Sequence, residues 1–181
     1  MKFDNILNEI KTVLDTVETN QVNEFINNIL SANTIVTIGA GRVGMAIKGF
    51  TMRLGHLGLK AFHLGDTSLP SIGENDLLIV ASGSGETQTI VDLTKIAKKN
   101  GANIFCITGN ENSRIGELSN HKLILKAPSK TKSINGFTSI QPMTTLNEQS
   151  LSILFDSIVL ELMEETKENH DSMWERHSNL E

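Results

Sequence analysis

The sequence predicts an α/β protein, specifically a three-layer αβα sandwich built around a five-stranded parallel sheet. Three observations support this fold class. Five short segments are almost wholly apolar, as expected for strands that are covered on both faces of a sheet. Amphipathic helical patterns alternate with these segments, which is typical of parallel sheets flanked by helices. Two of the apolar segments lead into glycine-rich loops that open helices, and ligands of open α/β sheets bind at such strand ends.

The N-terminal region, residues 1–31, predicts two helices. Apolar residues recur at helical spacing from Phe3 to Val17 and again from Val22 to Leu30. An alternation of strands and helices follows. The expected strands are residues 34–38, 59–64, 76–81, 103–108 and 121–126, and the expected helices among them are residues 43–57, 87–99 and 113–118.

The C-terminal part begins with a polar segment, residues 128–142, which we expect to form a long loop. A helix is expected over about residues 144–167. Its residues 151–163 include nine apolar residues of thirteen, so the helix should be buried on several sides or pack in an oligomer interface. We therefore expect one domain over residues 1–181, with residues 144–181 as its C-terminal helix and tail.

The composition limits the classes of function. The chain has 181 residues and a net charge of −5, whereas nucleic-acid binding needs clustered positive charge. Its most apolar stretch, residues 151–163, is too short and too charged to span a membrane. The five histidines lack metal-binding spacing and Cys106 is the single cysteine, so no metal site is expected. A lone cysteine fits a reduced core thiol in a cytoplasmic protein.

The first glycine loop follows residues 34–38. It reads Gly39-x-Gly41-x-x-Gly44, which is the spacing of the dinucleotide-binding fingerprint. Asp66 lies 22 residues beyond Gly44, near the position of a ribose-binding acid. Three interpretations of this loop stay open: NAD binding, a tight turn that lets the helix pack closely on the strand, or binding of another phosphate.

The second loop, Ser82 to Thr87, reads SGSGET and places three hydroxyls and two glycines between a strand and a helix. Glycine lets the backbone approach an anion, and hydroxyls, free N–H groups and the helix dipole all favour phosphate oxygens. The loop lacks the lysine of nucleotide-triphosphate loops. We therefore expect a site for a phosphomonoester, the alternative being a hydroxyl-rich helix cap.

Four parts of the chain together resemble the sugar-isomerase (SIS) domain family, and within it the 6-phospho-3-hexuloisomerases. The SGSGET loop resembles the wider family, whereas the IQPM…E segment and the HxNLE ending resemble the hexuloisomerases. The resemblance covers essentially the whole chain. The four parts are Gly39 to Gly44 with Met52 to His56, Ser82 to Thr87, Ile140 to Glu148, and His177 to Glu181.

The resemblance implies a flavodoxin-like or Rossmann-like sheet. It implies an enzyme that converts D-arabino-3-hexulose 6-phosphate to D-fructose 6-phosphate through an enediolate, with no metal or nucleotide cofactor. It further implies a homo-oligomer, commonly a tetramer, and a functional partner, 3-hexulose-6-phosphate synthase. The two enzymes would act in the ribulose monophosphate pathway of formaldehyde fixation.

The resemblance also points to individual residues. Glu148 is the expected catalytic base, although a carboxylate near a helix start is also explained by the helix dipole alone. His177 is the expected second catalytic residue, with His56 as the alternative and action in a neighbouring subunit left open. Two roles are open for Arg42: pairing with the phosphate, or with an acid such as Glu86. The expected substrate ligands are Gly41, Arg42, Ser82, Gly83, Ser84, Gly85, Glu86 and Thr87.

The chain departs from the family pattern in two places that concern the site. Val43 stands where a serine is common, which removes one expected hydroxyl contact to the phosphate. Residues 142–148 read PMTTLNE where the family has a PMGSLFE-like run, so the acid is kept and its neighbours differ.

Three other functions remain open. One is another SIS isomerase acting on a different sugar phosphate. A second is a non-catalytic sugar-phosphate-binding regulator, against which the acidic charge of the chain argues. The third is an NAD-linked oxidoreductase. The chain has no tyrosine, so it cannot use the Tyr/Lys catalytic pair of short-chain dehydrogenases.

Overall fold

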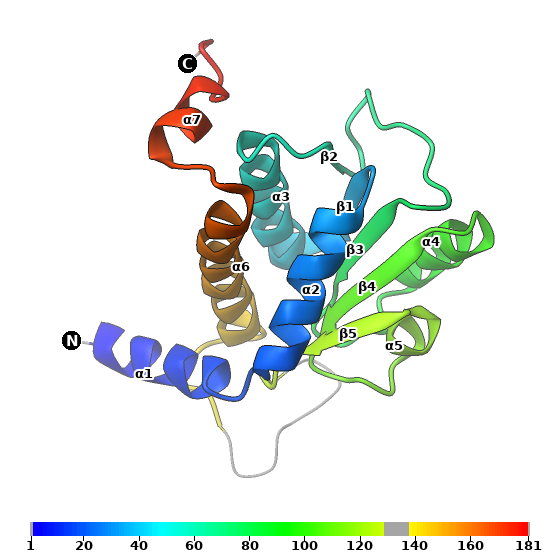
Figure 1. The fold of residues 1–181 in the computed structure, drawn as a ribbon. Helices are drawn as coiled ribbons and strands as arrows, with labels where there is room; N and C mark the ends of the chain where they lie inside the picture. Colours follow the sequence, from blue (N-terminus) through cyan, green and yellow to red (C-terminus); the bar gives the residue numbers. More distant parts are fainter. Residues whose placement is uncertain (1, 129–137, 181) are drawn as a thin grey trace.

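The computed structural model of the chain describes residues 2–128 and 138–180. Among these residues, five parallel strands form one sheet in the order β2-β1-β3-β4-β5 (Figure 1). The strands are β1 (Ile35–Gly39), β2 (Ala61–His63), β3 (Leu77–Ala81), β4 (Asn103–Thr108) and β5 (His121–Ile124). The helices are α1 (Phe3–Leu14), α2 (Thr19–Ser31), α3 (Gly41–His56), α4 (Gln88–Lys99), α5 (Arg114–Leu118), α6 (Thr145–Thr166) and α7 (His170–Glu175).

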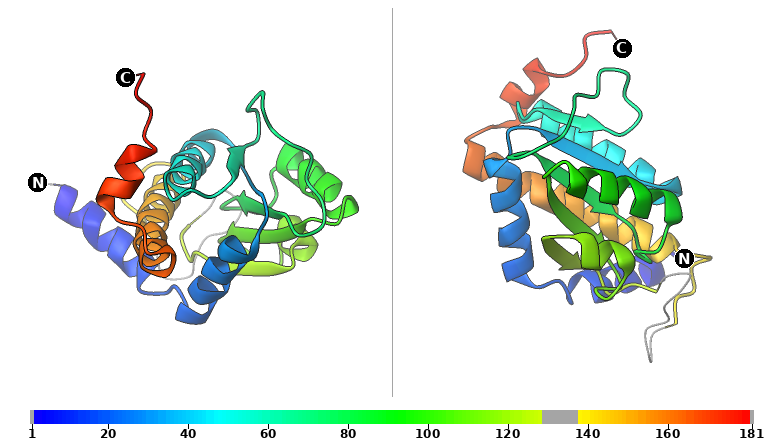
Figure 2. Two further views of the ribbon diagram at one scale, coloured as in Figure 1. Left: turned by 45° about the horizontal axis from the view of Figure 1, so that its top comes forward. Right: turned by 90° about the vertical axis from the view of Figure 1, so that its right-hand side faces the viewer.

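The sheet separates two layers of helices (Figure 2). Alternate side chains of a strand face opposite layers, as the two-residue period of a strand requires. In β3, Leu77 and Ile79 belong to the core shared with α2, α3 and α6, whereas Leu78 and Val80 belong to the core shared with α4 and α5. Helix α1 packs against α6 at the edge of the first layer. The predicted three-layer αβα sandwich is confirmed.

The expected strands and helices are present, with shifted ends. Helix α3 begins at Gly41, so the first glycine motif forms the opening turn of the helix and not a separate loop. The tail, for which no regular structure was expected, contains the short helix α7, which opens with a capping box between Asn169 and Ser172. Residues 129–137 of the expected long loop lie outside the described residues.

Two further expectations can be compared with the structure. Cys106 is fully buried in β4, and burial raises the pKa of its thiol to about 12, as expected for a core cysteine. None of the described helices is both long and apolar enough to cross a membrane.

Strand β1 and helix α3 approach each other closely at two glycines. A Cβ atom on Gly44 would lie 2.7 Å from the carbonyl oxygen of Gly39, which is too close for a backbone contact. The glycine at this position therefore serves close packing of the helix on the strand, one of the interpretations left open. Asp66, the candidate ribose-binding acid, accepts a hydrogen bond of 2.9 Å from the backbone N–H of His63.

We expect Gly44→Ala to lower the free energy of unfolding by about 1–3 kcal/mol, because the added Cβ must push α3 away from β1. Gly49→Ala is the matched control in the same helix, since nothing lies within 4 Å of its added Cβ. That variant should be neutral or stabilise by up to about 1 kcal/mol. Urea denaturation measures both changes, and equal values for the two variants would contradict the close-packing explanation.

Candidate active site

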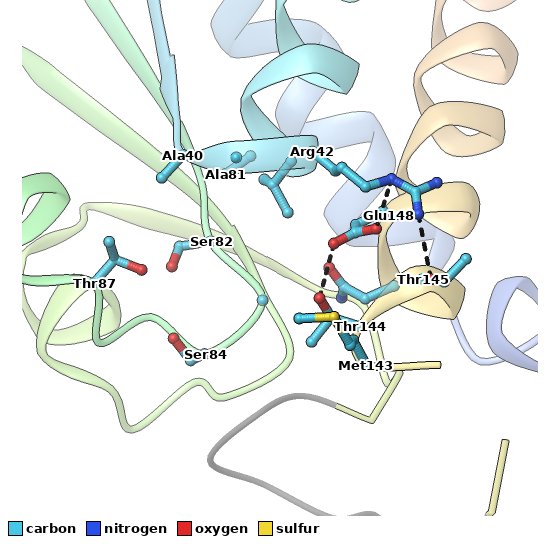
Figure 3. Close-up of a pocket in the computed structure, with 14 residues that line it drawn as sticks. Ala40, Arg42, Ala81, Ser82, Ser84, Thr87, Met143, Thr144, Thr145 and Glu148 are labelled. Carbon is cyan, nitrogen blue, oxygen red and sulfur yellow. Dashed lines mark hydrogen bonds and ion pairs between the residues drawn. The ribbon is translucent and has the colours of Figure 1, made fainter. Parts of the chain in front are cut away.

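A cavity of about 390 Å³ opens at the carboxyl ends of β1 and β3 (Figure 3). The strand order reverses here, because β1 continues to β2 on one side and β3 continues to β4 on the other. Ligands of open α/β sheets bind at such a switch point. Three segments line the cavity: residues 40–43, residues 81–84 with Thr87, and residues 143–148 apart from Leu146.

Three of the described helices, α3, α4 and α6, begin at this cavity. Their N-cap residues, Ala40, Thr87 and Thr144, make no side-chain hydrogen bond to the backbone N–H groups of the helix that follows. The first N–H groups of a helix have no partner within the helix, and the helix dipole makes this end positive. The cavity is therefore suited to an anion such as a phosphate.

The hydroxyl loop, Ser82 to Thr87, forms one wall of the cavity. The hydroxyl oxygen of Ser82 accepts the backbone N–H of Gly85 at 3.1 Å, and that of Ser84 accepts the N–H of Glu86 at 3.2 Å. These bonds fix the turn and leave the hydroxyl hydrogens of both serines available to donate. Figure 3 shows Ser82, Ser84 and Thr87 on the same side of the cavity. This wall can thus donate several hydrogen bonds to one anion.

Two expected ligands of this loop, Gly85 and Glu86, do not line the cavity. Gly85 has a φ of 66°, and a Cβ there would collide with the side chain of Ser113, so this glycine lets the loop pack on α5. The carboxylate of Glu86 accepts the side-chain Nε–H of Arg114 at 2.6 Å and its backbone N–H at 3.0 Å. These hydrogen bonds lower the pKa of Glu86. The expected ligands that do line the cavity are Gly41, Arg42, Ser82, Gly83, Ser84 and Thr87.

Glu148 lies in the first turn of α6, in the wall opposite the hydroxyl loop (Figure 3). Its side chain is 13% exposed. One carboxylate oxygen, Oε1, accepts the hydroxyl of Thr144 at 2.8 Å. The other, Oε2, lies 3.1 Å from Nε of Arg42 but makes no aligned hydrogen bond. The carboxylate is therefore fixed in the wall of the cavity by Thr144 and Arg42.

Arg42 stands at the rim of the cavity, with 57% of its side chain exposed. It donates to the hydroxyl of Thr145 at 3.3 Å in addition to its ion pair with Glu148. Arg42 thus pairs with an acid, one of its two expected roles, but the acid is Glu148 and not the suggested Glu86, which is paired with Arg114. Arg42 thus joins the start of α3 to the start of α6.

His177 and His56 do not line this cavity. The rings of the two histidines lie 5.2 Å apart at the far end of α3, and Trp174 stacks on His177 at 4.9 Å. Arg42 is near the start of α3 and His56 at its end, which separates them by about 21 Å at 1.5 Å per residue. Within a single chain, the structure does not bring either histidine to Glu148.

Sequence reasoning missed several residues of this region, among them Asn147 and Glu9. Asn147 is buried and lines the cavity beside Glu148, although an asparagine in this run had no distinguishing sequence pattern. Glu9 of α1 binds the segment that leads to the cavity. Its carboxylate accepts the backbone N–H of Ile140 at 2.8 Å, the hydroxyl of Ser139 at 2.8 Å and the side-chain amide of Gln141 at 3.0 Å. No local pattern links residues so far apart in the chain.

Comparisons with known proteins show the family to which this fold belongs. Residues 28–153 match the family model described as SIS domain. A 3-hexulose-6-phosphate isomerase of Bacillus subtilis is 36% identical, covering 97% of this chain and 95% of the relative. A protein of the same name from Mycobacterium gastri is 35% identical, covering 98% and 92%. A solved structure from Methanococcus jannaschii, with an inferred function of 3-hexulose-6-phosphate isomerase, has a TM-score of 0.87 at 30% identity and covers 99% of both chains.

The three hydrogen bonds at Glu9 generate a stability prediction. Glu9→Gln replaces one accepting oxygen by an NH2 group that faces donors, so we expect a loss of about 1–2 kcal/mol in the free energy of unfolding at neutral pH. Burial raises the pKa of Glu9, but the hydrogen bonds from Ile140, Gln141 and Ser139 outweigh it and lower the pKa below 4.5. The stabilisation is therefore present above about pH 4.5 and is lost as the pH falls through the folded-state pKa.

Thermal unfolding of wild type and Glu9→Gln across this pH range measures the difference, which should shrink in acid. Asp15→Asn is the control at the end of the same helix, where Asp15 makes an exposed ion pair with Lys11. Its cost should stay below about 0.5 kcal/mol. A difference between wild type and Glu9→Gln that is the same at every pH would contradict the role of the Glu9 carboxylate.

Proposed function

The chain belongs to the SIS domain family, and from this premise we propose that it is a sugar-phosphate isomerase that converts D-arabino-3-hexulose 6-phosphate to D-fructose 6-phosphate. One observation carries the proposal: the carboxylate of Glu148 faces the hydroxyl loop, Ser82 to Thr87, across one cavity. The relatives named 3-hexulose-6-phosphate isomerase support the choice of substrate. We propose that the chain acts as one domain over residues 1–181.

The phosphate binds at the wall made by the hydroxyl loop. Hydroxyls of Ser82, Ser84 and Thr87 donate to its oxygens, and the starts of α3 and α4 add positive potential. Val43 supplies no hydroxyl where the family often has serine, so these three side chains carry the side-chain part of phosphate binding. The carbon chain of the sugar then extends toward Glu148.

The proposed chemistry is a proton transfer next to a ketone. Glu148 takes the proton from C2, the electron pair forms the C2–C3 double bond, and the C3 carbonyl oxygen becomes an oxyanion. Return of the proton to C3, with transfer of the hydroxyl proton from O2 to O3, gives the C2 ketone. The guanidinium of Arg42, 3.1 Å from Glu148, supplies positive charge beside the enediolate oxygens.

The substrate needs no ring opening before this reaction. A C3 ketone reaches a ring of ordinary size only through O6, and O6 carries the phosphate. All groups in this mechanism are side chains or backbone of the chain itself, so the proposal includes no metal or nucleotide cofactor.

We propose that the protein works as a homo-oligomer, with a tetramer as the expected form. Large apolar side chains of α3 and α6 lie exposed, which supports an interface that includes these two helices. His177 enters the mechanism only if it reaches the cavity of a neighbouring copy. The functional partner expected upstream is 3-hexulose-6-phosphate synthase, which makes the substrate. The exposed side chains are Met45, Met52, Ile153 and Leu160.

The reaction is tested in a coupled enzyme assay. Hexulose-phosphate synthase with ribulose 5-phosphate and formaldehyde supplies the substrate, and phosphoglucose isomerase with an NADP-linked dehydrogenase reports fructose 6-phosphate. Glu148→Gln should lower kcat by about 10²–10⁴, the contribution of a general base. Glu161→Gln, on the exposed part of the same helix, should retain wild-type activity. Folded wild type without turnover would overturn the substrate, and an active Glu148→Gln would overturn the base.

The contribution of His177 is tested by mixing two inactive variants. If His177 acts in a neighbour's cavity, an oligomer of Glu148→Gln and His177→Ala chains contains some sites with both native groups. Random mixing restores about one quarter of the sites. We expect this recovery after unfolding and refolding the two variants together. A His177→Ala variant with wild-type activity, or a mixture with no recovery, would remove His177 from the mechanism.

A further inference from the structure

The carboxamide of Asn147 belongs to the lining of the cavity and has no hydrogen-bond partner among residues 2–128 and 138–180. The residue is 3% exposed and lines the cavity of 390 Å³. Among the residues that the structure describes, its carboxamide makes no hydrogen bond. Native proteins pair nearly all buried polar side chains, because leaving one unpaired costs free energy. An unpaired carboxamide that faces a cavity therefore indicates that a bound ligand supplies its hydrogen-bond partner.

The position of the carboxamide is set from two sides. A Cβ on Gly83 would lie 2.9 Å from Oδ1 and 3.1 Å from Cγ of Asn147, so the amide packs directly on the hydroxyl loop. Asn147 also precedes Glu148 in the first turn of α6. The amide therefore lies between the wall that suits the phosphate and the carboxylate that faces the reacting carbons.

We propose that Asn147 binds a sugar hydroxyl on C4 or C5, between the phosphate and the reacting carbonyl, and thereby selects the stereochemistry of the substrate. This inference rests on the proposed function of the same cavity. A carboxamide both donates and accepts, which matches a hydroxyl group. The helix starts that attract the phosphate do not distinguish one hydroxyl configuration from another.

The role is one of specificity and not of chemistry. A site built to hydrogen-bond a hydroxyl rejects analogues that cannot make the bond, because the buried group is then left unpaired. Asn147 is thus expected to separate fructose 6-phosphate from its epimers at these two carbons.

The test compares binding of four anions by calorimetry. They are fructose 6-phosphate, its C4 epimer tagatose 6-phosphate, its C5 epimer sorbose 6-phosphate, and inorganic phosphate. Asn147→Leu, which keeps the size of the side chain and removes its hydrogen bonds, should weaken fructose 6-phosphate binding about tenfold. Inorganic phosphate binding should stay unchanged, and the preference over at least one epimer should fall by a similar factor.

Ser150→Ala is the matched control. Ser150 is a fully buried polar residue of the same helix whose hydroxyl also has no partner, but it does not line the cavity. Its removal should leave all four affinities unchanged. Asn147→Ala is a second variant that guards against misfolding of Asn147→Leu, and both should unfold near the wild-type temperature.

The outcomes separate the two proposals. Wild type that binds inorganic phosphate but neither binds nor turns over the sugar phosphates would overturn the proposed function. Wild type that turns over the substrate, with Asn147 variants that keep its affinity and its preference over both epimers, would overturn the inference alone. Equal loss of inorganic phosphate and fructose 6-phosphate binding would make Asn147 a structural residue and would also overturn it.

Discussion

The site depends on one constraint: three of the described helices begin at the same cavity, and their first N–H groups have no partners within the helices. Strands β1 and β3 lead into α3 and α4 at this cavity, and the start of α6 completes it. None of the three N-cap side chains satisfies the backbone of its helix. The resulting positive potential is local. It explains how a chain with a net charge of −5 can offer a site for an anionic ester.

The same arrangement places a carboxylate opposite the hydroxyl loop. Arg42 from the start of α3 and Thr144 before α6 hold Glu148 in the wall of the cavity. Glu9 from α1 holds the segment that leads into α6. A helix that lies at the edge of the core is thereby connected to the reactive side of the cavity. The wall made by the hydroxyl loop and the wall that holds Glu148 are built from different parts of the chain, so mutations can affect one and spare the other.

Local patterns in the sequence predicted the fold and one wall of the site. Strands buried on both faces are continuous apolar runs, and β4 spans the six residues expected for it. Local patterns do not predict contacts between residues that are far apart in the chain. Three such contacts form the site and its surroundings: Arg42 with Glu148, Glu86 with Arg114, and Glu9 with residues 139–141. Helix α7 was missed because none of its side chains is buried, so it carries no apolar stripe. The C-terminal tail places His177 beside His56, at the end of α3 that lies far from the cavity. The spacing of residues in the sequence does not predict this position.

The central claim is that Glu148 removes a proton beside the ketone of a sugar phosphate held by the hydroxyl loop. Proton NMR of fructose 6-phosphate in deuterated water tests it most directly, because the reverse reaction passes through the same enediolate. The mechanism predicts that the wild-type protein exchanges the hydrogen on C3 for deuterium, and that Glu148→Gln does not. Exchange at C1 instead would indicate an aldose–ketose isomerase. Binding of fructose 6-phosphate without any exchange would contradict the claim and favour a protein that only senses the sugar.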